Sequence, residues 1–216
     1  MENDLKQLVN ENEKILYEGK PNKKCFIFES IFNPLMPFAL VWLLFDLFIS
    51  GGIFFSGATS NVGFFIIPFM LLHLMPVWIY LGGVLFTSRK YKNTYYIVTD
   101  SGIYVSGGIF SKTYNHKPFA ELSHVNLHRG IFDQMFNVGD IVMTSNQFMN
   151  GNMGNNFPGY YRNNSLNAAI AIRSVSNYVE VYNLVNKLQK DIYTDVMYPN
   201  DMRPPENNGY NTKYKG

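Results

Sequence analysis

The chain has 216 residues, a formal net charge of +2 and hydrophobic residues at 47% of its positions. So small a net charge gives no electrostatic argument for a nucleic-acid partner, because such binding depends on neutralising many phosphates. Cys25 is the single cysteine, which excludes a disulfide within the chain and suits a cytoplasmic location.

Residues 1–34 precede the apolar part of the chain and are rich in charged and polar side chains. They do not show the pattern of a cleaved signal peptide. Residues 15–21, ILYEGKP, predict a short extended piece that ends in a Gly/Pro turn. We expect residues 1–34 to form a cytoplasmic N-terminal segment.

Two long apolar runs follow. Asp46 is the only acidic, basic or histidine residue in Leu35–Phe55, and His73 is the only one in residues 62–86. Each run exceeds the roughly 20 apolar residues that a helix needs to cross a bilayer core. An uncharged turn, residues 56–61, joins them. We therefore expect residues 35–86 to form a transmembrane helical hairpin rather than two buried helices of a soluble bundle.

The charges on either side of the hairpin predict its orientation. Six basic residues flank it and none lies in its turn: Lys20, Lys23, Lys24, Arg89, Lys90 and Lys92. Positive flanks usually face the cytoplasm. We expect a protein of the cell membrane with two helices across the bilayer and both termini in the cytoplasm.

The residues after the hairpin change to a β pattern. Residues 94–99, TYYIVT, are β-branched and aromatic, which predicts a strand. Asp100-Ser101-Gly102 and Gly107-Gly108 both favour tight turns. Three antiparallel strands are expected: residues 94–99, 103–106 and 109–114.

Further strands and a helix are expected up to residue 192. Val125 and Leu127 alternate with polar neighbours, which predicts a strand with one buried face. Residues 141–145 and 167–173 predict two more strands. Apolar residues then recur at helical spacing: Tyr178, Val181, Val185, Leu188 and Ile192. The tail, residues 193–216, is expected to be disordered.

Asparagine and glycine dominate residues 146–165, so we expect a flexible insertion that is dispensable for folding. Five apolar side chains in it are candidate contacts with the bilayer or a partner: Met149, Met153, Phe157, Tyr160 and Tyr161. The alternative is a loop with no partner.

The order of four segments resembles a known family. They are residues 13–21 (EKILYEGKP), 96–103 (YIVTDSGI), 107–125 with its KPFAELSHV end, and 136–141 (FNVGDI). Together they resemble the bacterial pleckstrin-homology-like (PH-like) proteins, in the kind anchored by a transmembrane hairpin. The resemblance implies an α+β module in residues 87–192: a small split antiparallel β-barrel of six or seven strands capped by a C-terminal helix.

The resemblance does not imply an enzyme. It also gives no reason to expect phosphoinositide binding, because the first hairpin loop, Asp100-Ser101-Gly102, has no basic residue. His124 and His128 would lie roughly 13 Å apart on one strand. That is too far to share a metal whose ligands lie about 2.1 Å away. We expect no catalytic residue, no cofactor and no metal.

Asp46 and His73 are expected to meet inside the membrane. They lie nine and eleven residues from the turn ends of their runs, or roughly 13.5 and 16.5 Å along the helices. Ionisable groups at that depth usually face a polar partner. The pair then joins the helices, takes part in proton transfer or ligand binding, or separates so that each residue meets another subunit.

Three classes of function remain open on these observations. The first is a membrane-anchored, non-catalytic interaction module whose barrel docks on a protein or lipid surface. The second is an accessory subunit of a membrane complex that acts through the hairpin. The third is an intramembrane enzyme or proton-coupled carrier using Asp46 and His73. Expected partners are the bilayer and an unidentified protein, a second copy of the chain included.

Overall fold

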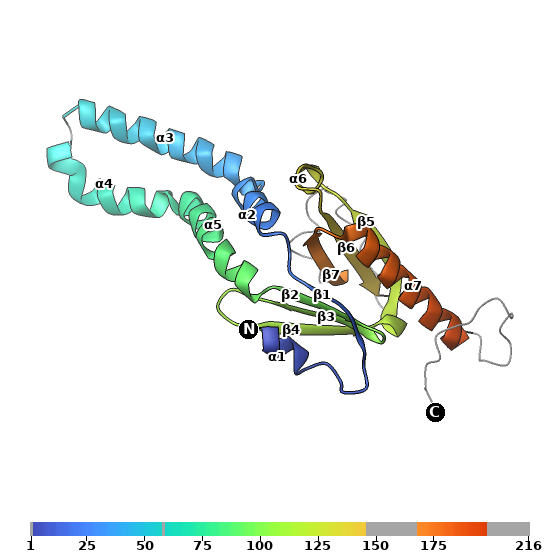
Figure 1. Ribbon diagram of the computed structural model, residues 1–216. Coiled ribbons are helices and arrows are strands. Elements are labelled where there is room, and N and C mark those ends of the chain that lie inside the picture. Colours follow the sequence, from blue (N-terminus) through green and yellow to red (C-terminus); the bar gives the residue numbers. More distant parts are fainter. Residues whose placement is uncertain (1, 58, 146–167, 198–216) are drawn as a thin grey trace. The chain divides into compact units, whose positions relative to one another are not determined.

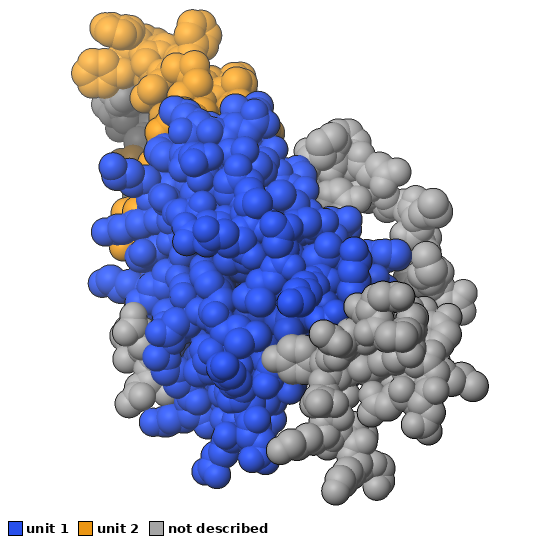
Figure 2. All heavy atoms as spheres, turned by 45° about the vertical axis from the view of Figure 1, so that its right-hand side comes forward, with its two compact units in different colours: residues 1–25, 90–216 blue, residues 26–89 orange. Residues whose placement is uncertain are grey.

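The structure, a computed structural model, describes residues 2–57, 59–145 and 168–197. The chain divides into two compact units (Figure 2). The sheet unit combines residues 1–25 with residues 90–216, and the helical unit contains residues 26–89. The predicted insertion, residues 146–165, and most of the predicted tail lie outside the described residues.

The first sheet of the sheet unit has four antiparallel strands in the order β1-β2-β3-β4 (Figure 1). Its strands are β1 (Ile15–Gly19), β2 (Tyr95–Thr99), β3 (Gly102–Gly107) and β4 (Thr113–Pro118). Both faces of β2 are covered: Tyr95 and Ile97 pack with Leu5 of α1 (Glu2–Lys6), whereas Tyr96 and Val98 face the main core. This explains why β2 is apolar or aromatic along its whole length instead of alternating with polar residues.

Strand β1 comes from the segment that the sequence placed before the hairpin. It pairs with β2 from Ile15 opposite Thr99 to Gly19 opposite Tyr96. Two strands that pair in one sheet therefore lie on either side of the helical residues in the sequence.

The turn between β3 and β4 is longer than the predicted Gly107-Gly108 turn. β4 begins at Thr113, so the strand expected at residues 109–114 starts four residues later. Gly108 has φ 115°, and a Cβ there would lie 1.9 Å from the Ser111 carbonyl oxygen. The loop folds back over this position, which only glycine fits.

The second sheet has three antiparallel strands in the order β5-β6-β7, with bounds Leu122–His128, Gly139–Ser145 and Ala168–Val175. The short helix η1 (Phe119–Glu121) precedes β5, and α6 (Ile131–Met135) joins β5 to β6. The expected split barrel of six or seven strands is thus confirmed in part: the seven described strands form two separate antiparallel sheets and not a closed barrel. The chain leaves the ladder at η1, so β4 and β5 do not pair.

The C-terminal helix, α7 (Tyr178–Met197), covers the second sheet as predicted and continues five residues past the expected end at Ile192. It contacts η1, β5 and β6. Val181, Val185 and Leu188 are buried in a core shared with both sheets. Their spacing of three and four residues places them on one face of the helix.

The helical unit contains most of α2 (Lys23–Ile31), all of α3 (Leu35–Phe55) and α4 (Thr59–His73), and most of α5 (Met75–Asn93). α3 has the bounds of the first apolar run. The second run is not one straight helix: it breaks at Leu74, where its two halves bend by 52°. By length and composition α3 alone suffices to cross a membrane, and the bent pair also suffices if its halves are counted as one span.

Docking of α7 can be tested at Val185, which is fully buried. Val185→Asp places an unpaired charge in the core and should lower the free energy of unfolding by about 3 kcal/mol or more. Lys187→Asp, at an exposed position of the same helix, is the control and should change little. Thermal unfolding of the full chain in detergent, followed by circular dichroism, measures both. Equal curves for the two variants would show that α7 is not docked in this register.

The attachment of the N-terminal segment can be tested at Glu13, just before β1. Its carboxylate accepts hydrogen bonds from Thr99 Oγ1 at 2.7 Å and from the Tyr104 hydroxyl at 3.2 Å. Burial, and then the charge of Glu13, raises the pKa of Tyr104 to about 12, so this hydroxyl remains a donor at neutral pH. Glu13→Ala should cost about 1–3 kcal/mol of stability in a urea titration. Glu11→Ala, at an exposed neighbour, should cost almost nothing, and a similar loss in both variants would contradict the assigned contacts.

Candidate functional site

The helical unit contains an acid–histidine pair inside its apolar helices. His73, at the end of α4, donates its Nδ1–H to Asp46 Oδ1 of α3 over 2.7 Å. Asp46 is only 3% exposed, although most large side chains around it on α3 are exposed. The structure thus brings together the two residues that the sequence placed at similar depths.

Aromatic rings hold the imidazole in place. Trp42 stacks on His73 with ring centroids 5.0 Å apart, and Phe69 stacks on it at 5.4 Å. Trp42 lies four residues before Asp46, and Phe69 lies four residues before His73, so each ring occupies the same helix face as its polar neighbour. The stacking fixes the plane of the imidazole and directs Nδ1 towards the carboxylate.

The break after His73 removes the usual helical hydrogen bond to the His73 carbonyl, and a side chain of α3 replaces it. Val77 donates its N–H to Leu74 O at 2.9 Å instead of to His73 O. Trp42 fills the vacated place, since its Nε1–H donates to His73 O at 2.8 Å. An unpaired carbonyl is costly in an apolar environment. Trp42 therefore supports both the imidazole ring and the bend next to it.

The second tryptophan has a similar role on the other side of the bend. Trp78 Nε1–H donates to Leu71 O at 3.1 Å. Pro76 lies between these two residues and has no N–H to offer, which is a common cause of a helix kink. Both tryptophans thus donate to carbonyls at the break instead of marking the helix ends.

One oxygen of the pair is unused. Among the residues that the structure describes, Asp46 Oδ2 is buried and has no hydrogen-bond partner. Leaving a buried acceptor without a donor costs stability. The site can therefore join two helices through Oδ1 while still accepting one further hydrogen bond through Oδ2.

The remaining residues singled out in the sequence lie elsewhere. The five apolar residues of the insertion, from Met149 to Tyr161, lie outside the described residues. Another histidine of the sheet unit, His116, was also considered as a metal ligand from the sequence; it stacks on Tyr104 in the first sheet, with ring centroids 4.1 Å apart. His124 and His128 are exposed on β5.

The structure also groups His128 with two acids that the sequence did not link to it, Asp133 and Asp140. Both carboxylates already accept backbone hydrogen bonds. Gly130 N donates to Asp133 Oδ2 at 2.8 Å, and Ser174 N donates to Asp140 Oδ1 at 2.7 Å. Both acids thus have a structural role: Asp133 in the connection from β5 to α6, and Asp140 between β6 and β7.

A second group that the sequence did not bring together contains three lysines, Lys20, Lys92 and Lys112, which line a pocket of the sheet unit. Two of them were recognised only as charges flanking the hairpin. These lysines lie far apart in the sequence and belong to no motif, so their proximity could not be predicted.

Comparison with known proteins agrees with this fold. A family model described as Bacterial PH domain matches residues 48–189, from within α3 to within α7. Neither the curated proteins nor the solved structures gave a match. The family match confirms the bacterial PH-like part of the resemblance and covers more than half of the 216 residues, and the first of the four segments, residues 13–21, lies before the matched range. The chain belongs to the bacterial PH domain family.

Proposed function

We propose that this protein is a membrane-anchored, non-catalytic interaction module. In this proposal α3 and the bent α4–α5 pair cross the cell membrane, and the sheet unit docks on a protein or a lipid surface in the cytoplasm. Membership of the bacterial PH domain family supports the binding role. The membrane anchor is supported by the exposed apolar surface of the helices.

The observation that carries the proposal is the exposure of α3. Only 11% of its most apolar 18-residue stretch is buried, and the side chains of Phe48 and Phe55 are 83% and 88% exposed. The core helix of a soluble protein covers its apolar side chains. Exposed apolar area on this scale is unfavourable in water at about 25 cal/mol per Å². A bilayer removes that cost, and the same argument applies to Phe65, Leu72 and Leu85 on the other two helices.

A cleaved signal sequence is the other common explanation for an apolar helix near an N-terminus. Here strand β1 lies before α3 and pairs with β2, which lies after α5. Cleavage after α3 would separate β1 from its sheet. This pairing favours an anchor that is retained.

The same pairing supports two crossings. Because β1 and β2 are neighbours in one sheet, the chain must enter and leave the helical segment on the same side of any membrane. An odd number of crossings is incompatible with this connection. The basic residues at both ends favour the cytoplasm as that side.

The unused oxygen of Asp46 favours a second candidate function, that of an accessory subunit acting through the hairpin. A donor on the helix of another membrane protein, or of a second copy, would satisfy Oδ2. Polar groups of this kind stabilise helix association in membranes. The hairpin then recognises the partner and the sheet unit is secondary.

Reporter fusions test the topology. Alkaline phosphatase, which is active only outside the cytoplasm, should be inactive when fused after Gly216 and active when inserted after Gly57 in the turn. The reverse pattern would contradict the orientation. Activity at both sites would contradict two crossings.

A double-mutant cycle tests the Asp46–His73 pair. His73→Leu leaves the Asp46 carboxylate buried with neither oxygen paired, so it should destabilise the full chain in detergent by about 1–3 kcal/mol. The double variant Asp46→Leu/His73→Leu also removes the unpaired buried carboxylate and should recover part of the lost stability. Melting temperatures of the four proteins measure the coupling. Additive effects would show that the two side chains do not interact.

A further inference from the structure

We propose that the lysine pocket of the sheet unit binds the phosphate of an anionic lipid headgroup. The lysine pocket is defined by Lys20, Lys92 and Lys112, which come from three distant parts of the chain. The pocket is small and partly enclosed, so it suits one phosphate group better than a large ligand. The proposal deepens the proposed function and rests on its membrane anchor.

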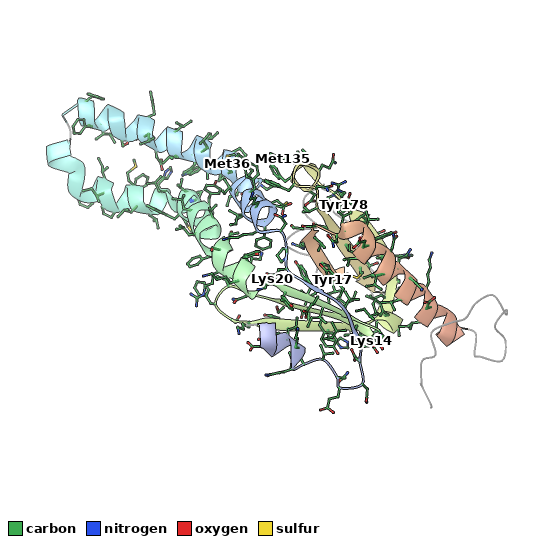
Figure 3. All side chains as sticks on the ribbon, in the orientation of Figure 1. Lys14, Tyr17, Lys20, Met36, Met135 and Tyr178 are labelled. Atoms are coloured by element: carbon green, nitrogen blue, oxygen red, sulfur yellow. The ribbon has the colours of Figure 1, made fainter. Side chains whose placement is uncertain are left out.

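The three lysines project from fixed elements. Lys20 directly follows β1, Lys92 is the penultimate residue of α5, and Lys112 immediately precedes β4. Figure 3 labels Lys20 at the end of its strand, and its Nζ lies 5.6 Å from the ring centroid of Tyr95 at the start of β2. This ring contact directs the ammonium of Lys20 along the pocket wall.

Hydrogen bonds fasten the end of α5 to the strands around the pocket. Ser106 Oγ–H donates to the Asn93 carbonyl at 2.8 Å, and Asn93 Nδ2–H donates to Gly108 O at 3.1 Å. Ser106 is buried. These bonds tie the residue next to Lys92 to β3 and to the loop that contains Lys112. These hydrogen bonds fix the backbone segments that carry Lys92 and Lys112 relative to each other, so the pocket does not depend only on side-chain conformations.

The charge balance of the pocket favours an anion. Lys112 pairs with Asp4 of α1, and this pairing lowers the pKa of Asp4 and raises that of Lys112. Asp4 also accepts a hydrogen bond from Tyr114, another residue that lines the pocket. The ammonium of Lys92 has neither an ion pair nor a hydrogen bond within the part of the chain that the structure describes. With Lys112 paired to Asp4, the ammonium of Lys92 still has its donors for phosphate oxygens.

The place of Lys92 in α5 favours a lipid over free phosphate. Lys92 lies six residues after Phe86, the last residue of the second apolar run, in one helix. Six residues of helix rise about 9 Å. The polar layer on each side of the roughly 30 Å hydrocarbon core is about 5–8 Å thick. If the apolar run ends at the edge of the core, the backbone of Lys92 lies at the outer edge of the headgroup layer, from which its long side chain can reach a headgroup.

The lysine pocket is also distinct from the first hairpin loop of the sheet. That loop, Asp100-Ser101-Gly102, joins β2 to β3 and has no basic residue. Tyr95 and Ser106, which line the pocket, face each other at the opposite end of the same two strands. A headgroup would therefore bind at the start of β2, next to the end of α5.

Lipid retention by the full chain tests the proposal. The protein is reconstituted in mixed phosphatidylcholine and phosphatidylglycerol nanodiscs, and native mass spectrometry measures the phosphatidylglycerol that remains bound after release into detergent. Lys92→Gln should reduce this retention about fivefold, the change expected for one lysine at an anionic surface. Lys92→Arg should keep it, because the charge remains. Lys187→Gln, at an exposed lysine of α7, should retain as much as the unmodified protein.

Two further arms separate the possible failures. Inorganic phosphate that displaces the lipid completely at a modest excess would overturn the preference for a lipid. Equal retention by Lys92→Gln and Lys187→Gln, in protein that resists alkaline carbonate extraction, would overturn the lysine pocket and leave the membrane anchor standing. Release of the protein by carbonate would overturn the anchor and this proposal with it.

Discussion

The pairing of β1 with β2 is the constraint on which the rest of the molecule depends. It makes residues before the apolar helices part of the same sheet as residues after them. The helical segment therefore leaves one sheet and returns to it, and its two ends are tied at neighbouring strands. The same connection brings Lys20, which follows β1, close to Lys92 and Lys112, so the lysine pocket is built from both flanks of the helical segment.

The polar side chains inside the apolar helices are few, and those at the bend form specific hydrogen bonds. Trp42 and Trp78 donate to carbonyls at the break near Leu74, and Asp46 holds the imidazole of His73. In an apolar surrounding, each such bond replaces one that water cannot supply. Asp46 Oδ2 is the exception among the described residues of the helical unit, and in the proposed accessory role it would accept a hydrogen bond from a partner helix.

The sequence predicted the elements whose signal is local. The bounds of α3, the buried face of α7 and the β2–β3 hairpin follow from run length, helical spacing and turn residues. Features that depend on distant residues were not predicted: the place of β1 in the sheet, the division of the seven described strands into two sheets, and the proximity of the three lysines. The break at Leu74 was not predicted although Pro76 lies next to it, because prolines are tolerated in membrane helices.

The most direct test of the account is the environment of Phe48, an exposed residue in the middle of α3. A spin label placed there by Phe48→Cys, in a Cys25→Ser background, would report on the full chain in lipid vesicles. The account predicts that oxygen, which concentrates in the hydrocarbon core, relaxes the label more strongly than a water-soluble nickel chelate. Stronger relaxation by the nickel chelate would place α3 in water and contradict the membrane anchor.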